Sequence, residues 1–300
     1  MGANRLDGKV CAKKVESALN SRIRTLAEAG SQPHLAVVIV GDDPASHVYV
    51  RSKERACERL GIRSTRIDLP ADTSFHEVLE TVNSLNQDSD VDGILVQSPL
   101  PRGMDELAIT DRILPEKDVD GFHPVNLGRL VQGRLDGLLP CTPAGVMYLL
   151  KDAELDLTGL KAVVLGRSRI VGMPMALLLA ARGADATVTV VHSRTTNIKD
   201  HCRDADLIVA AVGRPEMVRS EWVKSGAIVI DVGINRVDDS STDRGYRLCG
   251  DVDVDVESIA SYITPVPGGV GPMTISCLLA NTAVACARIN GLDEPHDLID

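Results

Sequence analysis

Short apolar runs rich in valine and isoleucine recur along this chain, and a glycine follows each of them within two residues. Runs of this kind, without alternating polar positions, are typical of strands buried on both faces of a parallel sheet. Helical patterns lie between them, so the sequence predicts an α/β fold with parallel strands and right-handed crossovers. The four clearest runs are residues 34–40, 161–165, 207–211 and 227–232.

Length and composition limit what kind of protein this chain can be. Its 300 residues favour two domains, and 44% hydrophobic residues provide enough material for their cores. A net charge of −10 and only 2% aromatic residues argue against nucleic-acid binding, which uses basic surfaces and aromatic stacking. The seven cysteines lack metal-binding spacing, which favours reduced thiols, a cytoplasmic protein and no metal. We expect no signal peptide and no apolar run of membrane-spanning length.

The segment after the first buried run carries a candidate reactive pair. A helix is expected to begin with Ser46 as its N-cap and to end at Gly61. Tyr49 and Lys53 then lie one helical turn apart on one face, close to the carboxyl end of a strand, where open α/β sheets bind ligands. An exposed pair on an amphipathic helix has the same spacing, so this segment alone leaves both interpretations open.

Further polar residues are expected at the same end of this sheet. Residues 91–97 are predicted to form a strand whose last residue is the amide Gln97. A polar loop over residues 115–126 contains Asp118 and Asp120 on either side of one valine. One carboxylate could accept two parallel hydrogen bonds from a ligand with adjacent N–H donors, although both aspartates could also be simple turn formers.

The second half of the chain is predicted to form another α/β unit. A helix is expected at Cys141, with Thr142 as its N-cap, and we place the domain crossing near this point. The predicted domains are residues 1–140 with 273–300, and residues 141–272.

A glycine-bearing turn in this second unit is a candidate nucleotide site. The strand 161–165 runs into this turn, and Pro174 opens the next helix. Strand, turn and helix N-terminus together bind a dinucleotide pyrophosphate through backbone N–H groups and the helix dipole. As a G-x-G-x-x-G motif the match is imperfect, because Ser168 replaces the second glycine. The candidate residues of the turn are Gly166, Arg167, Ser168, Ile170 and Gly172.

The next strand, residues 187–191, bears on the choice between NAD and NADP. A free ribose 2′-hydroxyl is usually bound by Asp or Glu just after this strand, whereas a 2′-phosphate needs cationic and hydroxyl donors. Ser193 and Arg194 follow the strand without an acid, and Arg167 adds a second cation. This pattern favours NADP, although a solvated polar strand end would look the same.

Later strand ends complete the expected surroundings of the ligands. Gly213 and the Gly233-Ile234-Asn235 segment follow the two remaining strands, where a missing side chain permits close approach of a ligand. Residues 264–274 hold several glycines between prolines, which predicts a shaped loop rather than helix or ladder strand. We expect this loop to lie against both ligands, and an apolar helix to run from it to about Ile289.

Five of these segments together resemble the bifunctional methylenetetrahydrofolate dehydrogenase/methenyltetrahydrofolate cyclohydrolase family. They occur in the family's order and cover nearly the whole chain. Ser98 departs from the pattern, since the family usually carries a larger apolar residue there, and we expect the pocket beside Gln97 to differ in shape. The segments are Tyr49-Val50-x-x-Lys53, Gly93-Ile94-Leu95-Val96-Gln97-Ser98-Pro99-Leu100-Pro101, Lys117-Asp118-Val119-Asp120-Gly121, Gly166-Arg167-Ser168-x-Ile170-Val171-Gly172-x-Pro174 and Pro265-Val266-Pro267-Gly268-Gly269-Val270-Gly271-Pro272-Met273-Thr274.

The resemblance implies a fold and an activity. The fold is an N-terminal α/β catalytic domain and a Rossmann-like NADP-binding domain, with a cleft between them. The activity is oxidation of 5,10-methylenetetrahydrofolate to the 5,10-methenyl form with NADP, followed by hydrolysis to 10-formyltetrahydrofolate, within one-carbon metabolism. A cytoplasmic homodimer is implied as well. Two alternatives are a monofunctional or NAD-preferring dehydrogenase and a non-catalytic folate- or NADP-binding regulator.

The resemblance also implies a role for each site residue. Lys53 is the main acid–base residue of the hydrolysis, Gln97 assists it, Tyr49 lies against the folate and Asp120 holds the pterin. The expected folate-binding set is Tyr49, Val96, Gln97, Pro99, Asp120, Pro267, Gly268 and Gly271. The expected NADP-binding set is Gly166, Arg167, Ser168, Ile170, Gly172, Ser193, Arg194, Gly213 and Ile234.

Overall fold

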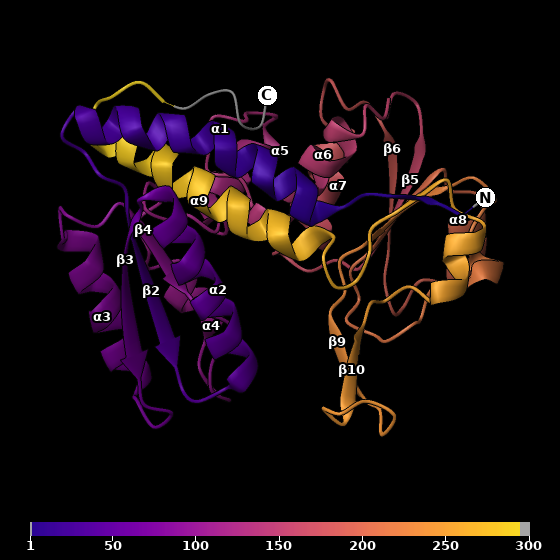
Figure 1. Cartoon of the computed structure of the whole chain (residues 1–300), viewed down its shortest axis with the longest axis horizontal. Coiled ribbons are helices and arrows are strands. Elements are labelled where there is room, and N and C mark those ends of the chain that lie inside the picture. Colours follow the sequence, from indigo (N-terminus) through magenta and orange to yellow (C-terminus); the bar gives the residue numbers. More distant parts are fainter. Residues whose placement is uncertain (1, 295–300) are drawn as a thin grey trace. The chain divides into compact units, whose positions relative to one another are not determined.

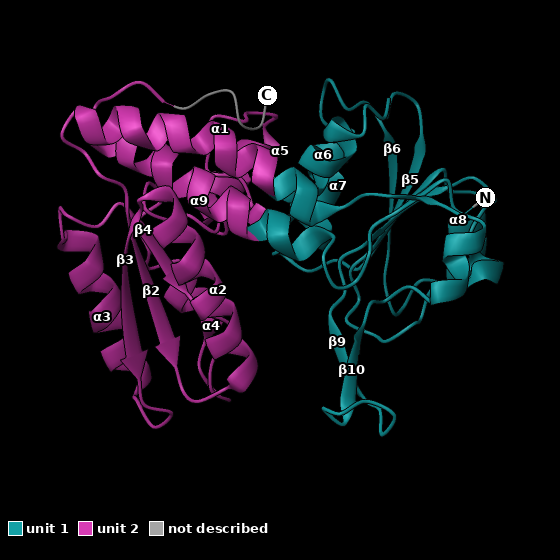
Figure 2. Cartoon of the chain, viewed as in Figure 1, with its two compact units in different colours: residues 1–12, 142–274 teal, residues 13–141, 275–300 magenta. Residues whose placement is uncertain are grey.

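The computed structural model describes residues 2–294, which form two compact α/β units (Figure 2). Unit 1 comprises Thr142–Thr274 and the residues before Lys13. Unit 2 comprises Lys13–Cys141 and the described residues from Ile275 onward. The chain passes between the units three times, and helices α1 (Gly8–Glu28) and α9 (Val270–Ile289) each continue from one unit into the other.

Unit 2 is built on a parallel three-stranded sheet in the order β3-β2-β4. The chain runs from β2 to β3 on one side and then crosses to β4 on the other, so the strand order reverses between β2 and β4. Right-handed crossovers in opposite directions put helices α2 and α3 on opposite faces, as Figure 1 shows. The elements are β2 (His34–Val40), α2 (Pro44–Leu60), β3 (Arg63–Leu69), α3 (Phe75–Gln87), β4 (Gly93–Val96), α4 (Glu106–Thr110) and α5 (Pro124–Val131).

The core of unit 2 follows from the alternation of side chains along β2. Every residue of β2 is buried, as a strand covered on both faces requires. Ala36, Val38 and Val40 face Val78 and Val82 of α3, together with buried side chains of β4 and α4. The amphipathic pattern of α3 therefore packs onto the even-numbered face of β2, and a complete capping box at Ser74 begins the helix.

Unit 1 is built on a parallel six-stranded sheet in the order β1-β11-β8-β7-β5-β6. From β5 the chain goes outward to β6 and then returns to β7 on the other side of β5, so the order reverses between β5 and β7. Ligands of such sheets bind at the carboxyl ends of the strands at this reversal. The strands are β1 (Asn4–Arg5), β5 (Lys161–Leu165), β6 (Thr187–Val191), β7 (Leu207–Ala210), β8 (Ile228–Asp231) and β11 (Tyr262–Ile263).

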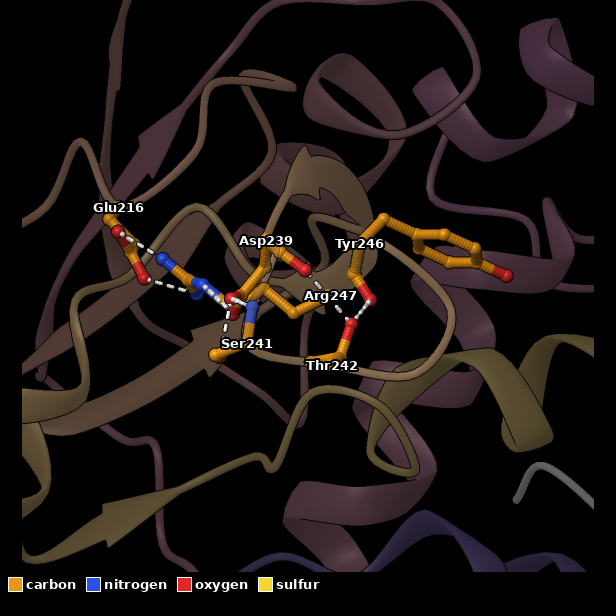
Figure 3. Close-up of polar contacts among 6 residues, drawn as sticks. All are labelled: Glu216, Asp239, Ser241, Thr242, Tyr246 and Arg247. Atoms are coloured by element: carbon orange, nitrogen blue, oxygen red, sulfur yellow. Dashed lines mark hydrogen bonds and ion pairs between the residues drawn. The ribbon is translucent and has the colours of Figure 1, made fainter.

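Helices and a separate hairpin complete unit 1. Residues 239–245 form the loop of an antiparallel hairpin, whose strands are β9 (Asn235–Asp238) and β10 (Tyr246–Cys249). Arg247 of this hairpin forms a two-pronged ion pair with Glu216, at 2.8 and 3.2 Å, and Asp239 lies on the other side of its guanidinium (Figure 3). The helices are α6 (Cys141–Asp152), α7 (Gly172–Ala180), α8 (Ile198–Arg203) and the 3₁₀ turns Ser220–Trp222 and Val254–Ser258.

Two predicted helix caps are wrong. Helix α2 begins at Pro44, and its N-cap is Asp43, which accepts hydrogen bonds from the backbone N–H and the hydroxyl of Ser46. Pro44 fits the first helical position, so Ser46 is already inside the helix. Helix α6 begins at Cys141, which places Thr142 in its first turn, where its hydroxyl pairs with that of Thr274 at 3.0 Å.

Helix α9 corrects two further expectations. It begins at Val270, so Gly271 and Pro272 form its first turn instead of belonging to a loop; proline is tolerated there because the first N–H groups have no partner within a helix. At 20 residues α9 is also long and apolar enough to cross a membrane, contrary to the expectation from sequence. Since 72% of this stretch is buried inside the protein, its apolar composition suits a core helix.

Candidate active site and nucleotide-binding turn

Lys53 is buried on helix α2, with only 8% of its surface exposed, whereas Tyr49 is 39% exposed one turn earlier. This excludes the interpretation of the two residues as an exposed surface pair. A lysine side chain is rarely buried, because its ammonium group loses hydration inside a protein. Burial accordingly lowers the pKa of Lys53 below the usual lysine range, and the charge of Asp120 opposes part of that shift.

Gln97 holds the lysine amine in one orientation. Its backbone N–H donates to the carbonyl of Val38 at 2.8 Å, which fixes the residue just beyond the end of β4. The Lys53 amine donates to Gln97 Oε1 at 3.0 Å, while Gln97 Nε2 donates to the carbonyl of Ser98 at 2.6 Å. The second bond determines which end of the amide faces the lysine, so Gln97 acts as an oriented acceptor.

The segment Lys117-Asp118-Val119-Asp120-Gly121 positions one carboxylate beside the lysine. Lys117 is buried and donates to three carbonyls at the end of α3, those of residues 85, 86 and 88. Asp118 accepts from the backbone of His123 and from the side chain of Asn126, and burial raises its pKa to about 7. Lys117 and Asp118 therefore have structural partners, which leaves Asp120 as the carboxylate available to a ligand.

Close packing sets the position of Asp120. A side chain at Gly93 would place its Cβ 2.6 Å from Val119, and one at Gly121, where φ is +77°, would meet the backbone of Leu139 at 2.4 Å. Asn281 of α9 donates to the carbonyls of Val119 and Leu139 at 2.8 and 2.9 Å. Burial raises the pKa of Asp120, and the positive charge of Lys53 partly offsets this.

Two groups near this carboxylate were missed by the sequence analysis. Glu106, at the start of α4, accepts a hydrogen bond from the hydroxyl of Ser98, and its charge adds to the rise in the pKa of Asp120. The buried thiol of Cys141 donates to the carbonyl of Val119 at 3.2 Å and interacts electrostatically with both Lys53 and Asp120. Glu106 was missed because acidic residues are common in the first turn of a helix, so its position in the sequence did not indicate a ligand nearby.

The glycine turn of unit 1 connects β5 to α7 at the reversal of strand order. Gly166 has φ +116°, and a Cβ there would lie 2.3 Å from the carbonyl oxygen of Ala211, just after β7. A Cβ at Gly172 would lie 2.3 Å from the carbonyl oxygen of Gly166. At both positions the neighbouring backbone is too close for any side chain, so glycine is required. A tight turn of this kind lets the backbone approach a pyrophosphate.

Ser168 explains the imperfect glycine motif. Its hydroxyl accepts hydrogen bonds from the backbone N–H groups of Val171 and Gly172, at 3.1 and 3.2 Å, at the start of α7. The serine thus stabilises the turn from within. Arg167 and Ile170 are exposed on the same turn, so the guanidinium of Arg167 can reach a phosphate.

The remaining predicted nucleotide contacts lie at neighbouring strand ends. Ser193 and Arg194 are exposed directly after β6, in a turn closed by a bond from the His192 N–H to the Thr195 hydroxyl. Gly213, with φ +63° and open space where a Cβ would be, follows β7, and the 41% exposed Ile234 follows β8. The tight glycine turn, the exposed arginines and the reversal of strand order are together the features expected of a site that binds the phosphates of a dinucleotide.

The predicted folate contacts are divided between the units. Val96 ends β4, Pro99 follows Gln97, and both belong with Tyr49 and Asp120 to unit 2. Pro267, Gly268 and Gly271 belong to unit 1, where a Cβ on Gly271 would lie 3.7 Å from the side chain of Ile234. The Ser98-Pro99 and Val266-Pro267 peptide bonds are cis. Within residues 2–294, no group of three or more His, Cys, Asp and Glu side chains could hold a metal ion.

One unit has a parallel sheet with a glycine turn, and the other buries a lysine that is bonded to an amide and feels the charge of a carboxylate. These features define a two-domain α/β protein with a nucleotide-binding fold. Comparison with known families assigns each part. Residues 6–120 match the catalytic domain of the tetrahydrofolate dehydrogenase/cyclohydrolase family, and residues 140–290 match its NAD(P)-binding domain. The chain belongs to this family.

Individual relatives agree over the whole chain. It is 54% identical over 300 residues to the bifunctional protein FolD of Synechococcus sp. (strain CC9902), covering 99% of both chains. The crystal structure of the bifunctional enzyme FolD from Campylobacter jejuni is 47% identical, with a TM-score of 0.90 over 95% of this chain and 99% of that one. The Trypanosoma brucei enzyme, solved with NADP and an inhibitor, is 42% identical, with a TM-score of 0.91 over 96% and 98%.

Proposed function

We propose that this protein oxidises 5,10-methylenetetrahydrofolate to 5,10-methenyltetrahydrofolate with NADP and then hydrolyses the product to 10-formyltetrahydrofolate. Membership of the family supports this assignment, as does the NADP bound by the Trypanosoma brucei relative. The observation that carries it is the buried Lys53 amine, oriented by Gln97 beside the carboxylate of Asp120. A protein that only bound folate or NADP would have no evident use for a desolvated lysine.

In the hydrolysis, Lys53 serves as the general base. Its lowered pKa enlarges the neutral fraction near pH 7, and the bond to Gln97 occupies one N–H so that the nitrogen lone pair can point away from the amide. Lys53 takes a proton from the water that attacks the methenyl carbon, which leaves a hydroxyl on that carbon. It returns a proton to N5 as the bond between the carbon and N5 breaks, and the hydroxyl proton is released to solvent as the formyl C=O forms. The carboxylate of Asp120 binds adjacent N–H donors of the pterin, and Tyr49 packs against the ring.

In the oxidation, the protein binds and aligns the two ligands. The nicotinamide supplies the hydride acceptor, so this step needs no protein acid or base. Gly166, Gly172 and Ser168 shape the turn that would hold the pyrophosphate, and Arg167, Ser193 and Arg194 provide the donors for a ribose 2′-phosphate. Ile170, Gly213 and Ile234 would complete the NADP-binding set, and Val96, Pro99, Pro267, Gly268 and Gly271 the folate-binding set.

Absorbance of the methenyl product tests this function. Purified protein is mixed with 5,10-methylenetetrahydrofolate and with either NADP or NAD, and the methenyl band is followed over time. We expect the band to rise with NADP, to rise less with NAD, and then to decay faster than in an enzyme-free control. A rise without accelerated decay would indicate a monofunctional dehydrogenase, a preference for NAD would contradict the cofactor assignment, and no rise with either cofactor would contradict the function.

We further propose that the protein works in the cytoplasm as a homodimer. Seven cysteines without a disulfide suit a reducing compartment, in which thiols stay unoxidised. The dimer rests on the family resemblance, and sedimentation analysis of the purified chain would distinguish a dimer from a monomer.

A further inference from the structure

Two buried carboxylates in unit 1 take no part in the chemistry described above. Asp251 is fully buried, and its two oxygens accept four hydrogen bonds. Oδ2 accepts from the backbone N–H groups of Val212 and Gly213 at 2.7 and 2.9 Å. Oδ1 accepts from the backbone N–H of Arg214 and from Asn235 Nδ2, both at 2.9 Å. Three consecutive backbone donors after β7 and one side-chain donor at the start of β9 therefore converge on a single carboxylate.

Asp231, the last residue of β8, continues this network. Its Oδ1 accepts from the backbone N–H groups of Gly233 and Asp251, at 3.0 and 2.9 Å, and its Oδ2 accepts from Val252 at 2.9 Å. The contacts leave no room for side chains nearby. A Cβ at Gly250 would lie 1.7 Å from Asp231, and one at Gly233 would lie 2.3 Å from Asp251.

The network fixes the two strand ends that carry predicted NADP contacts. Gly213 and Ile234 are exposed, but the backbone beside each is tied to a buried carboxylate. The loop after β7 is also joined to the hairpin, because the Glu216 N–H donates to the carbonyl of Gly250 and the Glu216 carboxylate pairs with Arg247 (Figure 3). Among residues 2–294, neither carboxylate forms an ion pair. Burying an unpaired carboxylate contributes little to stability, which points to a role in shaping this edge.

We propose that Asp251 is a positioning residue of the NADP site, which acts by holding the loop after β7 and the start of β9 in the shape that receives the cofactor. The inference rests on the proposed NADP function, because Gly213 and Ile234 are contacts only if that cofactor binds at this edge. Asp251 touches no ligand in this role; its carboxylate turns the N–H groups of the loop inward.

The substitution Asp251→Asn tests the role with little change of volume. In either orientation, the new NH₂ group faces two donors, and at least one of them is a backbone N–H that cannot rotate away. We expect the dissociation constant for NADP, measured by calorimetry, and the KM for NADP to rise by roughly tenfold or more, since bonds to a charged acceptor are lost. The hydrolysis rate of methenyltetrahydrofolate, which depends on Lys53 in unit 2, should stay close to that of the wild type.

Asp253→Asn is the matched control. Asp253 lies two residues away and caps a 3₁₀ turn through the N–H of Asp255, and asparagine caps as well as aspartate, so both activities should be retained. If Asp251→Asn misfolds and loses both activities, Asn235→Ala tests the positioning role instead. This variant removes one hydrogen-bond donor to Asp251 and should raise the NADP dissociation constant about two- to fivefold.

The outcomes separate this inference from the proposed function. If the wild-type protein binds NADP but does not oxidise methylenetetrahydrofolate, the proposed function is contradicted. The NADP dissociation constants of the variants would still test the role of Asp251. Unchanged NADP affinity in Asp251→Asn, or in Asn235→Ala where the first variant does not fold, would overturn the positioning role. A wild-type protein that binds no NADP would overturn both.

Discussion

At the scale of single residues, the site depends on two charges that shift each other. Burial lowers the pKa of Lys53, and the nearby Asp120 carboxylate raises it, so the lysine is held between a solvation penalty and an attractive charge. A general base acts in its neutral form, so the hydrolysis rate should rise with pH through the pKa of Lys53 and then level off.

Asp120→Asn should shift this pH profile. The substitution removes the negative charge that stabilises the ammonium form, so the pKa of Lys53 falls further and the rising limb of the hydrolysis rate moves to lower pH. The measurement is the pH dependence of kcat for methenyltetrahydrofolate hydrolysis at saturating substrate. Asp72→Asn, at an exposed carboxylate of the same unit, serves as the control. A limb that stays in place, or moves to higher pH, would show that Asp120 does not act on Lys53 in this way.

Local sequence could propose these residues but could not choose among them. The spacing of Tyr49 and Lys53 suits a surface pair as well as a site, and the hydrogen-bond partner of the buried Lys53 amine, Gln97, lies 44 residues further along the chain. The pair Asp118 and Asp120 was equally ambiguous. The resemblance favours Asp120, and in the structure Asp118 already accepts hydrogen bonds from His123 and Asn126. The sequence did not indicate a role for Asp251, because its hydrogen-bond donors come from two segments far from it along the chain.

At the scale of elements, strands were predicted well and helix starts less well. The bounds of β5 agree with the predicted run, because a short run of apolar β-branched residues has few alternatives to a buried strand. The bounds of β6 agree as well, although β6 is a half-exposed edge strand, because its valines and threonines favour extended backbone. Helix starts were less certain, since Asp43 and Ser46 are both good caps and only the position of Pro44 decides between them. The two-residue strands β1 and β11 were missed, because two residues carry no periodic pattern.

The close packing of the segment around Val119 beside β4 gives a test at this scale. Gly93→Ala would place a Cβ 2.6 Å from Val119, so it should lower the free energy of unfolding by about 1–3 kcal/mol and also slow hydrolysis by displacing Asp120. Gly128→Ala, in α5 with open space around it, should be neutral or stabilise by up to about 1 kcal/mol. Urea unfolding curves compare the two variants. Equal stability of the two variants would contradict the packing argument.

At the scale of the whole molecule, the residues proposed for hydrolysis and those proposed for NADP binding lie in different units. Unit 2 carries the buried lysine with its amide and carboxylate, and unit 1 carries the glycine turn and the exposed arginines after β5 and β6. Each unit has its own sheet and its own reversal of strand order. We therefore expect hydrolysis and NADP binding to be separable by mutation.

The most direct test of this division is Lys53→Met, which keeps the length and apolar stem of the side chain but removes the amine. On one preparation, the hydrolysis rate of methenyltetrahydrofolate and the dissociation constant for NADP are both measured, with the exposed Lys13→Met as the control. We predict that hydrolysis falls by roughly 10²- to 10⁴-fold, as general acid–base catalysis allows, while NADP affinity stays close to that of the wild type. Retained hydrolysis, or a comparable loss of NADP affinity, would contradict the account.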